Sequence, residues 1–167
     1  MQIMFVQQWI FLLLSALMKH FQFLIKFGTW NATLLLHEKH TLTDLAQAIL
    51  KAVKFELDHC YGFYAPEYFK RQRGVYKKVQ CEEYSLFADM DSGNTDISDG
   101  DTGVVTTLID DVFVSNKEMI FLFDYGDDWR FDVTCLKVSV GPAFKRAKIL
   151  ATEGIPPIQY RYDEEGH

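Results

Sequence analysis

The 167-residue chain lacks the features that specify a disulfide framework or a nucleotide cofactor. Its three cysteines, Cys60, Cys81 and Cys135, are far apart and form neither a metal-ligand pair nor a dense disulfide pattern. The sequence contains no GxxxxGK or GxGxxG phosphate loop and no GxSxG turn. These absences remove the usual grounds for nucleotide use and serine hydrolysis. We therefore predict no cofactor and expect a reducing, cytoplasmic environment.

The chain also lacks an excess of positive charge. It carries 17 Lys and Arg against 23 Asp and Glu, a formal net charge of -6. Such a field repels polyanions, whereas proteins that bind a phosphate backbone carry a clustered cationic face. Double-stranded nucleic acid is therefore not an expected partner. Apolar residues are plentiful, at 49% with 14 Phe, and in a chain of this length they predict one domain with one core.

The most apolar run lies at the N-terminus, in residues 3–18 (IMFVQQWIFLLLSALM). No Lys or Arg precedes it, no small-x-small cleavage site follows it, and it is shorter than the roughly 20 residues that span a bilayer. We therefore expect neither export nor a membrane span. Residues 1–18 are interpreted as an extension, either a packed helix or translated sequence upstream of a true start at Met18, with membrane attachment as a third alternative. Residues 19–167 are predicted to form the domain.

Two strands and a helix are predicted next. Residues 21–27 alternate strictly between apolar and polar, and 30–36 (WNATLLL) form a second strand, which predicts a hairpin turning near Gly28 and Thr29. Thr41 and Asp44 match a capping box, and apolar residues then recur at helical spacing to about residue 56. Residues 59–64 are interpreted as a short strand. Together these elements predict an α+β fold with a mostly antiparallel sheet and packed helices.

Two polar connections follow. Residues 66–78 combine aromatic side chains with most of the basic residues of this region, and 89–103 (DMDSGNTDISDGDTG) are polar and acidic, typical of a solvated loop. The acidic loop does not match a calcium-binding EF-hand, because the sixth and twelfth positions counted from Asp89 are Asn94 and Gly100. We interpret it as flexible.

The clearest supersecondary signal is the stretch MIFLFDY-GDD-WRFDVTCLKV, which predicts a central antiparallel hairpin. On its second strand Trp129, Phe131, Val133 and Cys135 share one face, while polar residues occupy the other. This alternation is typical of a sheet with one wet side.

The segment FDYGDDWRFDV, residues 123–133, resembles the Y-D-[FY]-G-D-x-W hairpin motif of the plasmid pRiA ORF-three-like family. Four further segments resemble the family in the same order: HFQFLIKF, TLTDLAQAILKAV, the element from His59 to Phe63, and KILATEGIPPIQY. The similarity covers about residues 19–163. The chain departs from the family at Trp30, which is followed by Asn31 and Ala32 instead of two arginines, and it stops soon after its paired prolines. It resembles a short variant.

This resemblance implies an α+β fold with an antiparallel sheet and packed helices. It also implies an occurrence in bacteria, archaea and mobile elements. It supplies no established activity, so function has to be argued from a site.

The main candidate site is the acidic turn with its flanking aromatic residues and one histidine. Its residues are Asp124, Tyr125, Gly126, Asp127, Asp128, Trp129 and His59. Three carboxylates on a tight turn are able in principle to bind a hard cation or to pair an acid with a base, which makes Asp124, Asp127 and Asp128 the metal candidates. The structural interpretation is favoured, because Gly-Asp-Asp is common in turns, with Gly supplying positive φ and Asp capping the backbone. We predict no metal site.

The histidines are also interpreted structurally. His59 and Cys60 are adjacent on a predicted strand, so their side chains are expected to point to opposite faces. His37 and His40 are spaced three apart at a strand end and not on a helix, which disfavours metal binding.

Three functional hypotheses follow. The favoured one is a non-enzymatic accessory or interaction protein, linked to mobile elements, in which the aromatic hairpin and acidic turn bind an unidentified protein partner. The second is a metal-dependent hydrolase using the turn at 124–128, with His59 as a possible base. The third is a factor that binds single-stranded nucleic acid through Lys70, Arg71, Arg73, Lys77 and Lys78 and the aromatic residues between them.

Overall fold

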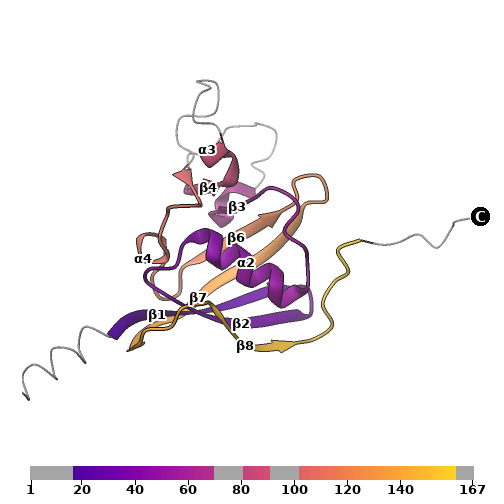
Figure 1. Cartoon of the computed structure of the whole chain (residues 1–167). Coiled ribbons are helices and arrows are strands. Elements are labelled where there is room, and N and C mark those ends of the chain that lie inside the picture. Colours follow the sequence, from indigo (N-terminus) through magenta and orange to yellow (C-terminus); the bar gives the residue numbers. More distant parts are fainter. Residues whose placement is uncertain (1–16, 70–80, 91–101, 161–167) are drawn as a thin grey trace, which may run out of the picture.

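A computed structural model describes residues 17–69, 81–90 and 102–160 of the chain (Figure 1). Its strands are β1 (Leu17–Phe27), β2 (Trp30–His37), β3 (Tyr61–Tyr64), β4 (Glu83–Ser85), β5 (Thr102–Gly103), β6 (Glu118–Phe123), β7 (Trp129–Pro142) and β8 (Lys148–Glu153). They form one eight-stranded sheet in the order β5-β4-β3-β6-β7-β1-β2-β8. All neighbours are antiparallel except β4 and β5, which run parallel.

The described helices are α2 (Leu42–Val53), η1 (Pro66–Phe69), α3 (Leu86–Met90) and α4 (Ile109–Val112), and only α2 is longer than five residues. The α+β prediction is therefore confirmed in its coarse form, a single sheet-rich domain. The finer prediction of an antiparallel sheet with packed helices is matched only in part. The sheet is mixed, and among the described helices α2 contributes most of the buried residues.

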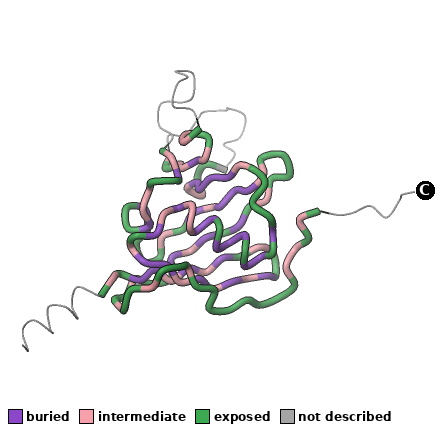
Figure 2. The backbone as a smooth tube through the Cα atoms, viewed as in Figure 1, coloured by how far each residue is buried: buried purple, intermediate pink, exposed green. Residues whose placement is uncertain are grey.

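The β1–β2 hairpin turns where the sequence predicted. Phe27 lies opposite Trp30, and Gly28 takes φ +57° in the two-residue turn, a position that a tight hairpin restricts to residues tolerating positive φ. Phe23 and Ile25 lie opposite Leu34 and Ala32, and all of these side chains are fully buried. The alternation in the sequence therefore marks the inner face, and Figure 2 shows it as buried and less buried residues alternating along the strands.

Helix α2 covers this inner face and packs on β2 and β8 (Figure 1). The predicted capping box is present: the Asp44 N–H donates to the Thr41 Oγ1 at 3.2 Å, and the Thr41 N–H donates to Asp44 Oδ2 at 2.8 Å. The helix ends at Val53, about three residues earlier than predicted, because Lys54 adopts a left-handed conformation at φ 66°.

The β6–β7 hairpin forms the centre of the sheet, as predicted. Phe131, Val133 and Cys135 are fully buried, while Arg130 and Asp132 are exposed on the other face. The Phe131 ring contacts the rings of Phe27, Trp30, Phe55 and Phe121, so it joins β1, β2, β6 and the segment after α2 into one core.

Several predictions fall partly or wholly outside the described residues. Residues 70–80, which hold the basic stretch, and 91–101, most of the acidic loop, are not described, and neither are 1–16. The loop assignment over 89–103 was wrong at both ends, because Asp89 and Met90 lie in α3, and Thr102 and Gly103 form β5. Asp89 accepts hydrogen bonds from the Val104 and Val105 N–H groups at 2.7 and 3.1 Å. β1 begins at Leu17, which lies opposite Pro142. No helix within the described residues is long and apolar enough to cross a membrane.

Candidate functional site

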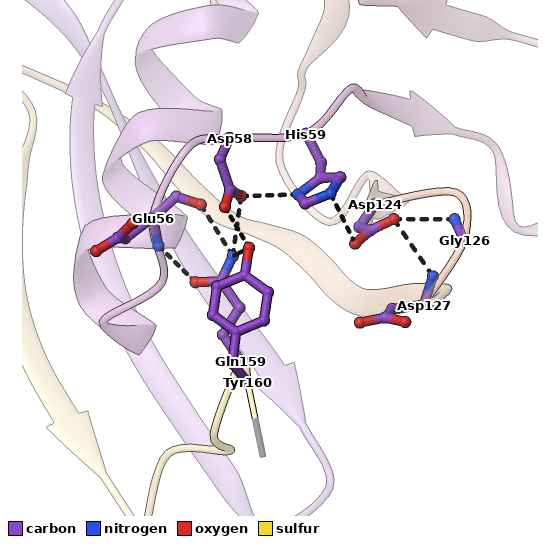
Figure 3. Close-up of polar contacts among 8 residues, drawn as sticks. All are labelled: Glu56, Asp58, His59, Asp124, Gly126, Asp127, Gln159 and Tyr160. Atoms are coloured by element: carbon purple, nitrogen blue, oxygen red, sulfur yellow. Dashed lines mark hydrogen bonds and ion pairs between the residues drawn. The ribbon is translucent and has the colours of Figure 1, made fainter. Parts of the chain in front are cut away.

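The candidate site forms where the β6–β7 turn meets the residues that lead into β3 (Figure 3). β3 and β6 are antiparallel, with Tyr61 opposite Phe123, and the Asp124 N–H donates to the Cys60 carbonyl at 3.0 Å. Residues just before β3 therefore lie beside residues just after β6. This register brings His59 to Asp124, two predicted site residues that are far apart in the sequence.

The strand predicted over residues 59–64 begins only at Tyr61, so His59 lies in the preceding loop. The prediction that His59 and Cys60 point to opposite faces of a strand was therefore wrong, because neither residue lies in a strand. Free of the strand's alternation, the imidazole turns toward the β6–β7 turn (Figure 3).

The turn itself is held by Asp124. Its Oδ1 accepts hydrogen bonds from the Gly126 and Asp127 N–H groups at 2.9 and 3.3 Å, and its carbonyl accepts one from the Asp128 N–H at 2.7 Å. The predicted capping by Asp is thus confirmed. The predicted role of glycine was wrong, because the positive φ angles belong to Asp124 (54°) and Asp128 (58°), and Gly126 has none. Short polar side chains that bond to nearby backbone tolerate this conformation.

His59 lies between two carboxylates. Its Nδ1 is 2.8 Å from Asp58 Oδ1, and its Nε2 is 3.6 Å from Asp124 Oδ2. The hydrogen bond to Asp58 raises the pKa of His59 above its ordinary value, and the charges of Asp124 and Asp127 add to the effect. Both ring nitrogens face carboxylates, so the arrangement favours a retained proton. It does not suit a histidine that must accept a proton from a substrate.

The C-terminal segment completes this cluster (Figure 3). Gln159 binds the main chain of Glu56 at both ends of its amide, accepting from the N–H at 2.6 Å and donating to the carbonyl at 3.2 Å. The Tyr160 hydroxyl donates to Asp58 Oδ2. This bond lowers the pKa of Asp58, with His59 as the second cause, and raises the pKa of Tyr160 to about 12.

Sequence reasoning missed Asp58, Gln159 and Tyr160. Nothing in their spacing connects residues more than a hundred positions apart. The one available signal was the similarity of the closing segment KILATEGIPPIQY to the family, which contains Gln159 and Tyr160.

The other predicted site residues do not join the cluster around His59 and Asp124. Asp128 pairs with Arg130, with 2.7 Å between Asp128 Oδ2 and an Arg130 guanidinium nitrogen. Trp129 turns inward and packs on Phe27 and Phe55, with ring centroids 5.4 and 4.9 Å apart. Asp127 is exposed to solvent.

These contacts separate the three carboxylates of the metal hypothesis. One oxygen of Asp124 binds backbone N–H groups, the other faces His59, and Asp128 faces Arg130. Across the described ranges, no three His, Cys, Asp or Glu side chains are grouped in a way that could hold a metal ion. The geometry therefore gives the hydrolase hypothesis no ligand set at this turn.

Exposed aromatic side chains lie beside the turn. The Tyr125 hydroxyl is 2.5 Å from that of Tyr64, and its ring centroid is 5.1 Å from that of Phe87. Tyr64 in turn lies 4.5 Å from Tyr68, centroid to centroid. We call Tyr68, Phe87 and Tyr125 the aromatic patch, and their exposed fractions are 44%, 42% and 39%.

Fold and site together define a sheet-rich domain with an acidic hairpin turn beside a histidine. The family described as plasmid pRiA4b ORF-3-like protein matches residues 30–159, and the chain belongs to this family. Curated proteins yield no match. A solved structure, the protein of unknown function MM3350 from Methanosarcina mazei Go1, is similar with a TM-score of 0.57 and 20% identity, over 81% of this chain and 69% of that one. This likeness concerns the fold alone.

Proposed function

We propose that the protein is a non-enzymatic interaction domain that binds a protein partner through the acidic turn and the aromatic patch. The observation that carries the proposal is the position of Tyr125, which lies inside the turn sequence and contacts Phe87 and Tyr64 of the neighbouring elements. One continuous surface therefore combines exposed carboxylates with exposed aromatic rings.

The chemistry of this surface indicates the partner. Apolar side chains scattered singly are ordinary on protein surfaces, but clustered aromatic residues beside charge are typical of interfaces. Asp127 and Tyr125 are both exposed and lie two positions apart on the same turn, so the turn offers a carboxylate and an aromatic ring to a positive group. We infer a partner segment that carries Arg or Lys next to an apolar side chain.

The cluster around His59 supports a structural role behind this surface. The Asp58–His59–Asp124 contacts fix the loop before β3 against the turn, and Tyr160 fixes the C-terminal segment to the same loop. A turn held in this way presents its exposed residues in one geometry, which reduces the entropy lost on binding. The plasmid origin in the family's description supports an accessory role linked to mobile elements.

The test is selection from a random peptide library displayed on phage, with the full chain as bait. We expect enrichment of peptides with Arg or Lys beside an apolar residue, and loss of their binding by at least about tenfold in Tyr125→Ala and Asp127→Asn. Asp132→Asn is the control, because it removes one charge from the exposed face of β7. Failure to enrich such peptides, or equal binding by all variants, would overturn the proposal.

A second measurement separates this proposal from the hydrolase. The melting temperature is followed against magnesium, manganese, calcium and zinc for the wild type and for the double variant Asp127→Asn, Asp128→Asn. Because ligands that bind the folded state raise the melting temperature, an increase lost in the double variant would favour a metal enzyme and contradict the interaction domain. We expect the two proteins to respond alike.

A further inference from the structure

A second candidate site, independent of the acidic turn, is a cavity of about 550 Å³ between α2 and the residues that join β7 to β8. The lining residues on α2 are Asp44, Gln47, Ala48 and Lys51, preceded by His40, and those on the other side are Lys145, Arg146, Ala147 and Ile149. Ligand pockets commonly enclose about 300 to 1,000 Å³, so the cavity has the size of a small-molecule site. It shares no residue with the candidate site described above.

The charge of this cavity is opposite to that of the chain. Three cationic side chains, Lys51, Lys145 and Arg146, face one acidic side chain, Asp44, in a protein whose net charge is -6. The Asp44 carboxylate is already bound, because its Oδ2 accepts hydrogen bonds from the Thr41 N–H and Oγ1 at 2.8 and 3.2 Å. Asp44 keeps its negative charge, so three cations against one carboxylate leave the lining with an excess of two positive charges.

His40 adds a hydrogen-bond donor that has no acceptor. The His37 N–H donates to His40 Nδ1 at 3.0 Å, so Nδ1 is an acceptor and a neutral ring must carry its proton on Nε2. The ring is neutral near pH 7, because burial lowers the pKa of His40 and the neighbouring His37 lowers it further. Within the described residues, Nε2 is buried and has no hydrogen-bond partner.

The main chain at Lys145 does not satisfy this donor. It lies close enough to the ring to oppose the lowering of the pKa of His40, yet it makes no hydrogen bond of ordinary geometry with Nε2. His40 is only 5% exposed, so bulk water does not satisfy the donor either. Buried N–H groups are nearly always paired, so an unpaired donor on a residue that lines a cavity requires an explanation, and a ligand oxygen in the cavity supplies one.

We propose that this cavity binds a small molecule bearing a phosphate group. Lys51, Lys145 and Arg146 hold the anion by charge, and the Nε2–H of His40 donates to one of its oxygens. Ala48, Ala147 and Ile149 form an apolar wall for the rest of the ligand. The ligand class is a phosphomonoester on an apolar or aromatic body.

The experiment titrates the full chain with inorganic phosphate and with phenyl phosphate, at constant ionic strength set with chloride. The readout is the nitrogen resonances of His40, assigned by comparison with His40→Asn. Both ligands are expected to shift the Nε2 resonance in a saturable way. Phenyl phosphate is expected to bind more tightly than phosphate, because its ring has the apolar wall to pack on.

Two double variants with equal loss of charge test the position of the site. Lys145→Gln, Arg146→Gln is expected to weaken phenyl phosphate binding by at least about tenfold. The control, Lys26→Gln, Lys137→Gln, removes two exposed cations outside the cavity. It is expected to change the affinity for phenyl phosphate less than about twofold. His40→Asn, whose amide oxygen still accepts from the His37 N–H, is expected to weaken binding without unfolding the protein.

Equal weakening of phenyl phosphate binding in the two double variants would show that binding depends only on the net charge of the protein, and would overturn the proposal. Binding that leaves the His40 Nε2 resonance unchanged would also overturn it, because the ligand would then occupy another place. A shift that never saturates would overturn it as well. None of these outcomes depends on the peptide selection, so the two proposals succeed or fail separately.

Discussion

Two histidines, His59 and His40, lie in different surroundings, and their pKa values are shifted in opposite directions. His59, whose side chain is 43% exposed, lies between the carboxylates of Asp58 and Asp124, and its pKa is raised. His40 is buried against His37, lines a cavity with three cations, and its pKa is lowered. The surroundings therefore decide whether an imidazole holds its proton more tightly between carboxylates or is kept neutral as a buried hydrogen-bond donor.

The largest difference is expected in stability. His40→Ala should lower the free energy of unfolding at pH 7 by about 2 to 3 kcal/mol, because it removes a buried ring and leaves the His37 N–H without an acceptor. The His40 ring stacks on that of His37 with centroids 3.7 Å apart, so the lost packing is substantial. Urea unfolding measures the change. His59→Ala is the matched control and should have a much smaller effect. Equal losses would contradict the distinction between the two regions.

A smaller effect is expected at the turn. Asp124→Ala removes the acceptor of the Gly126 and Asp127 N–H groups at a residue with φ 54°, and should lower stability by about 1 kcal/mol. Asp124→Asn retains an acceptor oxygen and tolerates the left-handed conformation, so it should lower stability less. The comparison is made by urea unfolding of both variants. An Asn variant as unstable as the Ala variant would assign the effect to the charge facing His59 and not to the turn.

The difference between the two regions also shows which features a sequence can predict. Both hairpins and the capped helix α2 follow from local pattern, because alternation and cap residues act over a few positions. The Gly28 turn was predictable for the same reason. The β4–β5 pair was not, since these strands have only three and two residues, too few for an alternation to appear.

The sites depend on contacts that no local pattern encodes. Asp124 was singled out by its motif, but its proximity to His59 depends on the register of β3 against β6. The His37 and His40 spacing was judged only for metal binding. The hydrogen bond from the His37 N–H that fixes the proton of His40 appears only once the loop after β2 has its three-dimensional form.

The pH dependence of stability should have opposite sign for the two histidines. The pKa of His59 is raised above 6.5, so its stabilisation is complete below that pH and is lost as pH rises through the folded-state pKa. Its partner Asp58 has a pKa below 3.8, so its own contribution persists down to about pH 4. The pKa of His40 is lowered below 6.5, so its contribution is present above pH 6.5 and is lost as pH falls.

Urea unfolding of wild type, His59→Gln and His40→Asn across this pH range measures both trends. His59→Gln should lose more stability, relative to wild type, at pH 5 than at pH 8. His40→Asn should lose more at pH 8 than at pH 5. Two variants with the same trend would show that the neighbouring charges do not control these groups.

The smallest effect on stability is expected at Asp127. Its side chain is exposed and its N–H, not its carboxylate, holds the turn, so Asp127→Asn should change the free energy of unfolding by less than about 0.5 kcal/mol. The same substitution should remove the binding of basic peptides, because the carboxylate is what the partner's cation meets. Asp124→Asn should have the opposite pattern in part. It disturbs the contact with His59, which affects stability, but it leaves Asp127 exposed for peptide binding. Loss of binding without loss of stability would show that Asp127 serves partner binding and is not needed for folding. If Asp127→Asn instead unfolds the protein, the acidic turn is a structural element and the partner must bind elsewhere.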